Sequence, residues 1–299
     1  MSEQLCDVGR GITLCYETFG DESEPPMLLI QGLGMQMLGW PDDFCRQLAD
    51  RGFYVVRFDN RDSGRSTQVR GRPPSPGQLL RRRISPVLYT LSDMAADAQG
   101  LLRGLQLEPA HVVGVSMGGM IAQTVAAEHP ASVRSLVSIM SNTGSRWRGQ
   151  PSFSVYRFLL RAAPADRDAY VNHTAALFSL IGSRGMPRDT ELVRDIAARS
   201  YDRGVDPAGS GRQLGAILAS GNRTPQLRRI AAPTLVIHGS KDLMVSRSGG
   251  VATARAIPGA RMVTIEGMGH DLPSAAWPQL LDAISEQAQA ADRTPITTQ

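Results

Sequence analysis

The chain has 299 residues, which is enough to bury one large hydrophobic core or two modest ones. Its 42% hydrophobic and 20% charged residues are ordinary for a globular protein and exclude a largely disordered chain. The formal charge of +4 comes almost entirely from arginine, because Lys241 is the only lysine. Six arginines lie between residues 65 and 83, in a Pro- and Gly-rich stretch without aromatic residues. This pattern favours a solvated loop over a nucleic-acid site.

Neither a secretion signal nor a membrane span is expected. The N-terminus lacks a basic region followed by an apolar run, so we expect a cytoplasmic protein. The longest stretch without a charged residue, 109–127, is interrupted by glycines and Gln123, and it predicts a strand, a turn and a helix. The three cysteines form no CxxC motif or Cys/His cluster, so no zinc site is expected. A Cys6–Cys15 pair remains open.

Short apolar runs rich in β-branched residues recur along the chain between Gly and Pro residues. Such runs are typical of parallel strands that are buried on both faces. Apolar residues at helical spacing lie between the runs, at 91–105 with Thr90 or Ser92 as a cap, directly after Ser116, and at Ala275–Gln289. The alternation predicts a doubly wound, mostly parallel α/β sheet. The predicted strands are Ile12–Tyr16, Met27–Ile30, Phe53–Phe58, Val112–Val115, Leu136–Met140, Thr234–Ile237 and Met262–Ile265.

The alternation stops between residues 144 and 222, where only helical patterns follow one another. A helical block between two strands predicts a cap over the carboxyl edge of the sheet, where open α/β sheets bind ligands. We therefore expect a core of 1–143 and 223–292, a cap of 144–222 and a flexible tail of 293–299. The cap helices are predicted at Phe153–Leu160, Asp166–Leu180, Asp189–Arg199 and Gly211–Ala219.

The pentapeptide Gly114-Val115-Ser116-Met117-Gly118 carries the strongest chemical signal. A strand that turns abruptly into a helix forces the central residue into a strained conformation and exposes its hydroxyl above the sheet. Small residues at 114, 118 and 119 let this turn close. A Gly-rich turn with an incidental serine would share the bare pattern, but the strand before it and the helix after it favour Ser116 as a nucleophile.

A serine hydroxyl needs an adjacent base. Of the five histidines, His270 follows the last predicted strand on a Gly-rich loop, which can return over the sheet edge toward Ser116. The others are interpreted as structural or as cap residues. Asp242 follows the penultimate strand and precedes His270, and it can hold the imidazole in one tautomer. Asp271, beside His270, is interpreted as solvated.

The oxyanion of an acyl-transfer reaction is best stabilised by fixed backbone N–H groups. We expect one from Met117, directly after the nucleophile, and one from Leu33 in the loop after strand Met27–Ile30. Met35 and Trp40 flank these donors and could line an apolar acyl pocket, although packing explains them equally well.

Several segments of the chain resemble a known family. The segments 38–42, 58–66, 114–119, 233–237 and 267–270 are similar to those of α/β-hydrolase fold enzymes of the esterase, cofactor-free haloperoxidase and enol-lactonase group, and most of all to aclacinomycin methylesterase-like proteins. The resemblance covers about 20–140 and 230–285. Gln31 replaces the usual histidine of the oxyanion loop. Asp62 replaces a common glycine in a loop similar to the family's D-x-R-G-x-G-x-S stretch, which we interpret as a structural brace.

The resemblance implies hydrolysis of a small-molecule carboxylic ester through an acyl-enzyme, without metal or cofactor and without a nucleic-acid or membrane partner. Three alternatives stay open. The chain could be a specialist for methyl esters or lactones of antibiotic or aromatic metabolism, a perhydrolase in which peroxide replaces water, or a hydrolase-fold receptor that binds without turnover.

Overall fold

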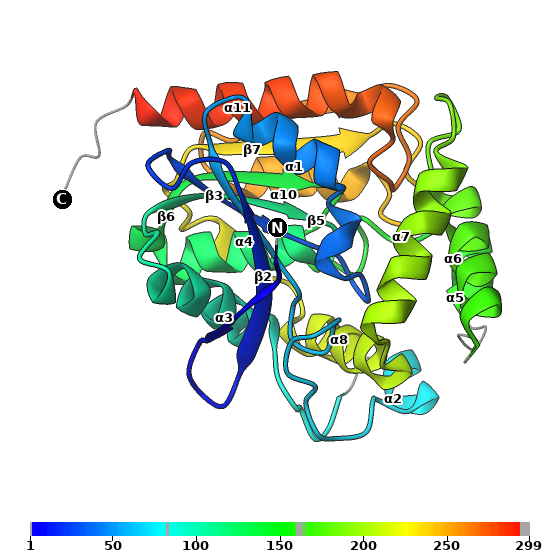
Figure 1. Cartoon of the computed structure of the whole chain (residues 1–299). Coiled ribbons are helices and arrows are strands. Elements are labelled where there is room, and N and C mark those ends of the chain that lie inside the picture. The colour runs from blue at the N-terminus through cyan, green and yellow to red at the C-terminus, as the bar shows by residue number, and fades with distance from the viewer. Residues whose placement is uncertain (1, 82–83, 160–163, 165, 294–299) are drawn as a thin grey trace.

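The computed structural model describes residues 2–81, 84–159, 164 and 166–293 (Figure 1). Eight strands form one sheet in the order β1-β2-β4-β3-β5-β6-β7-β8, in which β1 and β2 are antiparallel to their neighbours and the other strands are parallel. The predicted doubly wound, mostly parallel sheet is therefore confirmed. The strands are β1 Gln4–Asp7, β2 Thr13–Phe19, β3 Pro26–Ile30, β4 Tyr54–Phe58, β5 Ala110–Val115, β6 Val133–Ile139, β7 Thr234–Gly239 and β8 Arg261–Ile265.

Each predicted strand is present, with ends that differ from the prediction by at most three residues. β1 was not predicted, because this edge strand is mostly exposed and has no apolar run. Residues 109–127 form β5 and α4, and among the described residues no helix is long and apolar enough to cross a membrane. Cys6, Cys15 and Cys45 are free thiols, so the Cys6–Cys15 pair is absent.

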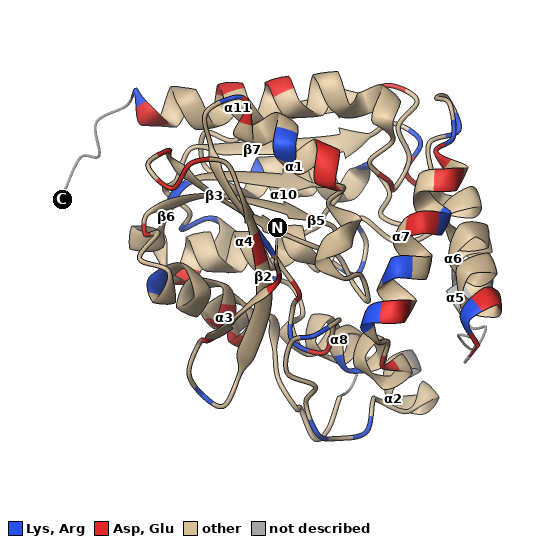
Figure 2. Ribbon diagram, in the orientation of Figure 1, with Lys and Arg blue, Asp and Glu red and all other residues tan. Residues whose placement is uncertain are grey.

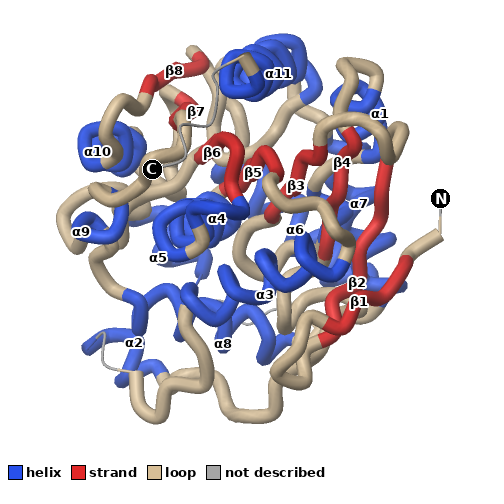
Figure 3. The backbone as a smooth tube through the Cα atoms, turned by 90° about the vertical axis from the view of Figure 1, so that its left-hand side faces the viewer, coloured by secondary structure: helices blue, strands red, loops and turns tan. Residues whose placement is uncertain are grey.

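Helices cover both faces of the sheet (Figure 3). α1 (Asp42–Ala49) and α11 (Trp277–Asp292) pack on one face, whereas α3 (Leu91–Gly104), α4 (Met117–Glu128) and α10 (Ser248–Ala256) pack on the other. Successive strand residues point to opposite faces, so Val112 joins the core under α3 and α4 while Val113 joins the core under α1 and α11. A capping box of Thr90 with Asp93 begins α3, so Thr90 is the cap of the two that the sequence left open.

Among the described residues, four longer helices lie between β6 and β7 in the chain and form what we call the helical insertion. They are α5 (Phe153–Leu159), α6 (Arg167–Ile181), α7 (Thr190–Arg203) and α8 (Pro207–Ser220), and the short α9 (Thr224–Leu227) leads back to the sheet. In Figure 1, α5, α6 and α7 lie beyond the tip of the β7 arrow, at the carboxyl end of the strands. Acidic and basic residues alternate along α7 (Figure 2).

The arginine-rich stretch contains a helix as well as loop: α2 spans Pro76–Arg81. Arg65 is exposed and pairs with Glu3 at 2.6 Å. Arg82 and Arg83 lie outside the described residues, as do Leu160 of a predicted helix and 294–299 of the predicted tail.

Two arginines of the insertion bind aspartates of the loop that follows β4. Arg203 of α7 donates to Asp59 at 2.7 Å, and Arg212 of α8 donates to both oxygens of Asp62 at 2.6 and 2.9 Å. Both aspartate side chains are fully buried. Asp62 has a φ of 65°, so it keeps the left-handed backbone that a glycine adopts more easily. The aspartate that departs from the family pattern therefore anchors the insertion.

Removing one partner of this buried pair leaves an uncompensated charge. We expect Arg212→Met to lower the free energy of unfolding by about 3–5 kcal/mol. The double variant Asp62→Gly/Arg212→Met should recover part of this loss, since it removes both charges and the positive φ of a non-glycine residue. Urea unfolding of the three proteins measures both effects. A loss below about 1 kcal/mol in Arg212→Met would contradict the anchoring role.

Candidate active site

Ser116 occupies the turn between β5 and α4. Its φ of 56° and ψ of −118° are strained for a residue with a Cβ atom, at a cost of about 1–3 kcal/mol. The turn closes only because its neighbours are small. A Cβ atom on Gly114 would lie 2.1 Å from the Gly118 carbonyl oxygen, and one on Gly118 would lie 2.1 Å from the Ile30 carbonyl oxygen. The backbone N–H of Ser116 donates to Ile139 of β6 at 2.8 Å, which fixes the turn to the sheet.

The structure brings Ser116, His270 and Asp242 together. The Ser116 Oγ lies 3.0 Å from His270 Nε2, and His270 Nδ1 lies 2.7 Å from Asp242 Oδ2. The other Asp242 oxygen accepts the N–H groups of Met244 and Val245 at 2.9 and 2.8 Å. An ionised Asp242 can only accept, so Nδ1 carries the proton and Nε2 is left to accept the serine hydroxyl.

A second histidine lies beside Asp242. His238 Nε2 is 3.5 Å from Asp242 Oδ2 and donates to the Val245 carbonyl at 2.8 Å. Burial lowers the pKa of His238, and the Asp242 carboxylate offsets only part of this shift. His238 is therefore a neutral structural residue that supports the loop around Asp242, in agreement with its interpretation from the sequence.

The loop of His270 rests on the helical insertion. The His270 N–H donates to the Ile181 carbonyl at 2.8 Å, and the Gly269 N–H donates to Ser183 Oγ at the same distance. Ser183 in turn donates to Asp271 at 2.5 Å, and burial raises the pKa of Asp271. Asp271 is thus half-buried against segment 181–185 rather than fully solvated. No sequence signal identified Ser183.

The two expected oxyanion donors belong to segments that meet beside Ser116. Met117 is the first residue of α4, so its N–H has no acceptor within the helix. Leu33 lies in a turn closed by the Met35 N–H on the Gly32 carbonyl at 3.2 Å. A Cβ on Gly32 would lie 3.3 Å from that of Ser116, so the loop passes directly beside the serine.

Three side chains hold this loop. Gln31 accepts the Gly32 N–H at 2.7 Å, and Asn60 donates to the Gln31 carbonyl at 3.0 Å. Gln213 of α8 accepts the Gly34 N–H at 2.8 Å and donates to Arg61 and Ser63 of the loop after β4. Gln213 is fully buried. The glutamine in place of the family histidine therefore takes part in the loop, and the sequence alone did not indicate Gln213.

Of the two residues expected to line a pocket, only Met35 does so. Trp40 is fully buried and its ring packs against Phe44, 5.6 Å away, in the core under α1 and α11. The pocket role of Trp40 is thus wrong, because α1 begins right behind it and turns it inward. Met35 borders a cavity between residues 34–41, helices α6 and α7, and the segment after His270, with Tyr170, Phe178, Asp189, Ile196 and Asp271 in its walls.

Comparison with known proteins shows the family of this chain. Residues 25–273 match the family described as alpha/beta hydrolase fold. The chain belongs to the alpha/beta hydrolase family. It is 30% identical to rhodomycin D methylesterase DnrP of Streptomyces peucetius, over 94% of this chain and 96% of that protein.

More distant hydrolases share the fold. A 3-oxoadipate enol-lactonase of Acinetobacter baylyi is 25% identical over 78% of this chain and 77% of that protein. The solved structure of a thermophilic esterase from Thermogutta terrifontis has a TM-score of 0.72 at 22% identity, and covers 97% of this chain and 99% of that one. Within this α/β-hydrolase family, the methylesterase aligns through the helical insertion as well as the core.

The buried His238 predicts a pH dependence of stability. Its pKa is lowered in the folded protein, so the unfolded chain binds more protons below about pH 6.5. The contribution of the neutral His238 to the free energy of unfolding is complete above this pH. It decreases as the pH falls, by at most about 1.4 kcal/mol per pH unit. We expect a shallower decrease between pH 7 and pH 5 in His238→Gln, measured by urea unfolding. An unchanged slope would mean that His238 does not remain neutral in the folded state.

Proposed function

We propose that this hydrolase cleaves carboxylic esters, with Ser116 as nucleophile, His270 as general base and Asp242 as the acid that orients it. The observation that carries the proposal is the continuous hydrogen-bonded chain from the Ser116 hydroxyl through His270 to a fully buried Asp242. Each distance lies within the 2.6–3.2 Å that proton transfer requires. The similarity to named methylesterases and esterases supports the same reaction class.

In acylation, Ser116 Oγ attacks the ester carbonyl while His270 Nε2 takes the hydroxyl proton. The resulting imidazolium is stabilised by Asp242 and then gives the proton to the departing alcohol. The negative oxygen of the tetrahedral intermediate accepts the N–H groups of Leu33 and Met117, and the N-terminus of the 12-residue helix α4 adds a favourable field.

In deacylation, water takes the place of the alcohol. His270 removes a proton from the water molecule, which attacks the acyl-enzyme carbonyl. The tetrahedral intermediate then collapses, Ser116 regains its proton from His270, and the carboxylic acid leaves. Every step uses groups of this chain, the ester and water.

We further propose that the helical insertion acts as a cap that selects the substrate. It supplies Tyr170, Phe178 and Ile196 to the cavity that begins one residue after His270. The acidic walls of this cavity are Asp189 and Asp271, and none of its described lining residues is basic. A substrate with a free carboxylate would be repelled there, so uncharged, largely apolar esters fit best.

A methyl-ester specialist is the second candidate. It is favoured by the similarity to rhodomycin D methylesterase, which extends over 94% of this chain and therefore includes the insertion that we assign to substrate selection. In this case the methoxy group leaves as methanol and the bulk of the substrate occupies the cavity.

Turnover of p-nitrophenyl esters from acetate to palmitate tests the main proposal. We expect measurable hydrolysis by the wild type and its near-complete loss in Ser116→Ala, with unchanged unfolding. Asp242→Asn should reduce kcat by about 10⁴-fold through the wrong imidazole tautomer. Methanol release from bulky methyl esters, without hydrolysis of p-nitrophenyl esters, would favour the specialist. Ligand binding without turnover of any ester would contradict both.

Ser183 is expected to position His270 rather than to touch the substrate. Ser183→Ala removes the acceptor of the Gly269 N–H and the donor to Asp271. We expect kcat to fall roughly 10- to 100-fold because the imidazole loses its alignment, while KM changes little. Steady-state kinetics separates the two constants. A higher KM with an unchanged kcat would assign Ser183 to substrate binding instead.

A further inference from the structure

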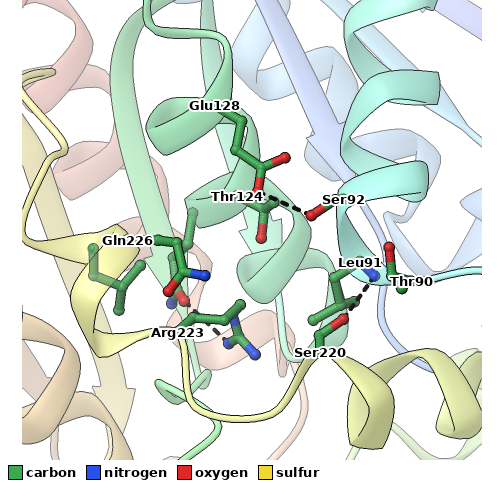
Figure 4. Close-up of a pocket in the computed structure, with 10 residues that line it drawn as sticks. Thr90, Leu91, Ser92, Thr124, Glu128, Ser220, Arg223 and Gln226 are labelled. Atoms are coloured by element: carbon green, nitrogen blue, oxygen red, sulfur yellow. Dashed lines mark hydrogen bonds between the residues drawn. The ribbon is translucent and has the colours of Figure 1, made fainter.

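A second cavity of about 110 Å³ lies between α3, α4 and the segment that joins α8 to α9 (Figure 4). Ser116, Asp242 and His270 do not line it. Its walls come from the start of α3, from Thr124 and Glu128 of α4, and from Ser220, Arg223 and Gln226. About 10–15 Å³ of such space is enough to hold one water molecule, so the cavity can hold a small ligand.

Arg223 gives this cavity its chemistry. The residue is 3% exposed, and its Nη2 donates to the Asn142 carbonyl at 2.7 Å and to Gln123 Oε1 at 3.4 Å. Its Nε and Nη1 have no hydrogen-bond partner in the described part of the chain. In Figure 4 the guanidinium projects into the space that Thr124, Leu91 and Ser220 surround. Buried N–H donors without partners are rare and costly, so these two point to an acceptor that the chain itself does not supply.

The charge of Arg223 is equally unbalanced. The other buried arginines of the described residues each bind a carboxylate: Arg57 binds Glu17, Arg61 binds Asp97, and Arg212 binds Asp62. No such ion pair reaches Arg223 from the described residues, and burial alone lowers its pKa to about 10. At neutral pH the guanidinium therefore still carries its positive charge. A buried cation without a counterion costs several kcal/mol, which a bound anion would offset.

The rest of the wall is compatible with an anion. The N-terminus of the 14-residue helix α3 points here, and the Leu91 N–H donates to Ser220 Oγ at 2.9 Å. Gln226 Oε1 also lacks a partner within the described residues, so its amide can rotate to present the NH₂ group. The one carboxylate in the wall, Glu128, is exposed and accepts the Ser92 hydroxyl at 2.9 Å, so solvent weakens its repulsion.

We propose that this cavity is a binding site for a small oxyanion, a carboxylate or a phosphate, held by the Nε and Nη1 of Arg223. The site connects α3 and α4 of the core with the residues where the helical insertion returns to the sheet. Binding therefore stabilises this junction. The proposal is independent of the proposed ester hydrolysis, because the two sites share no residue.

Thermal unfolding in sodium acetate, sodium phosphate and sodium chloride, at equal ionic strength and pH, tests the site. At about ten times the Kd, an oxyanion should raise the Tm of the wild type by roughly 2 °C over chloride. A rise in acetate alone identifies a carboxylate site, and a rise in phosphate alone identifies a phosphate site. Arg223→Met should lose the rise, whereas the control Arg228→Met, an exposed neighbour, should keep it.

Ser220→Asp provides a test that does not depend on the folding of Arg223→Met. It keeps an acceptor for the Leu91 N–H and places a carboxylate in the cavity. The variant gives up the hydrogen bond from Ser220 Oγ to the Ala216 carbonyl, and we expect it to fold and to lose the response to oxyanions. Equal Tm values of the wild type in all three salts would overturn the proposal, as would an undiminished response in Arg223→Met or Ser220→Asp.

Discussion

The strained turn at Ser116 is the constraint on which the arrangement of this molecule depends. A serine with a φ of 56° is tolerated only because β5 is buried between two neighbouring strands and because Gly114 and Gly118 leave no side chain in the turn. The cost of this conformation, about 1–3 kcal/mol, is met by packing elsewhere. In return, the hydroxyl projects beyond the carboxyl edge of a parallel sheet, where the loops after β3, β7 and β8 also begin.

The sheet places these loops near each other, but the helical insertion fixes their final positions. Ser183 binds the loop of His270, Gln213 binds the loop of Leu33, and Arg212 binds the loop after β4 through Asp62. The insertion thus contacts both sides of the candidate site with buried hydrogen bonds. A change that loosens the insertion is expected to disturb the base and the oxyanion loop together, even though it touches neither directly.

Most of the strands, many of the helices and the Ser116–Asp242–His270 group could be predicted because each leaves a local pattern: an apolar run, a helical stripe, or a motif at a strand end. Residues whose position depends on packing between distant segments could not be predicted from the sequence. Trp40 follows the oxyanion loop in sequence yet turns into the core, and Asp271 is covered by a segment 88 residues away in the chain. Gln213 and Arg223 lie in ordinary helical or loop sequence, and only the folded chain shows what their side chains contact.

The central claim is that the turn and the His270–Asp242 pair make Ser116 a nucleophile. Labelling with a fluorophosphonate, which phosphonylates an activated serine and releases fluoride, measures this directly. Intact-protein and peptide mass spectrometry should find one adduct per chain, on Ser116, formed far more slowly in His270→Ala. Adduct formation on another serine, or equal rates with and without His270, would contradict the account.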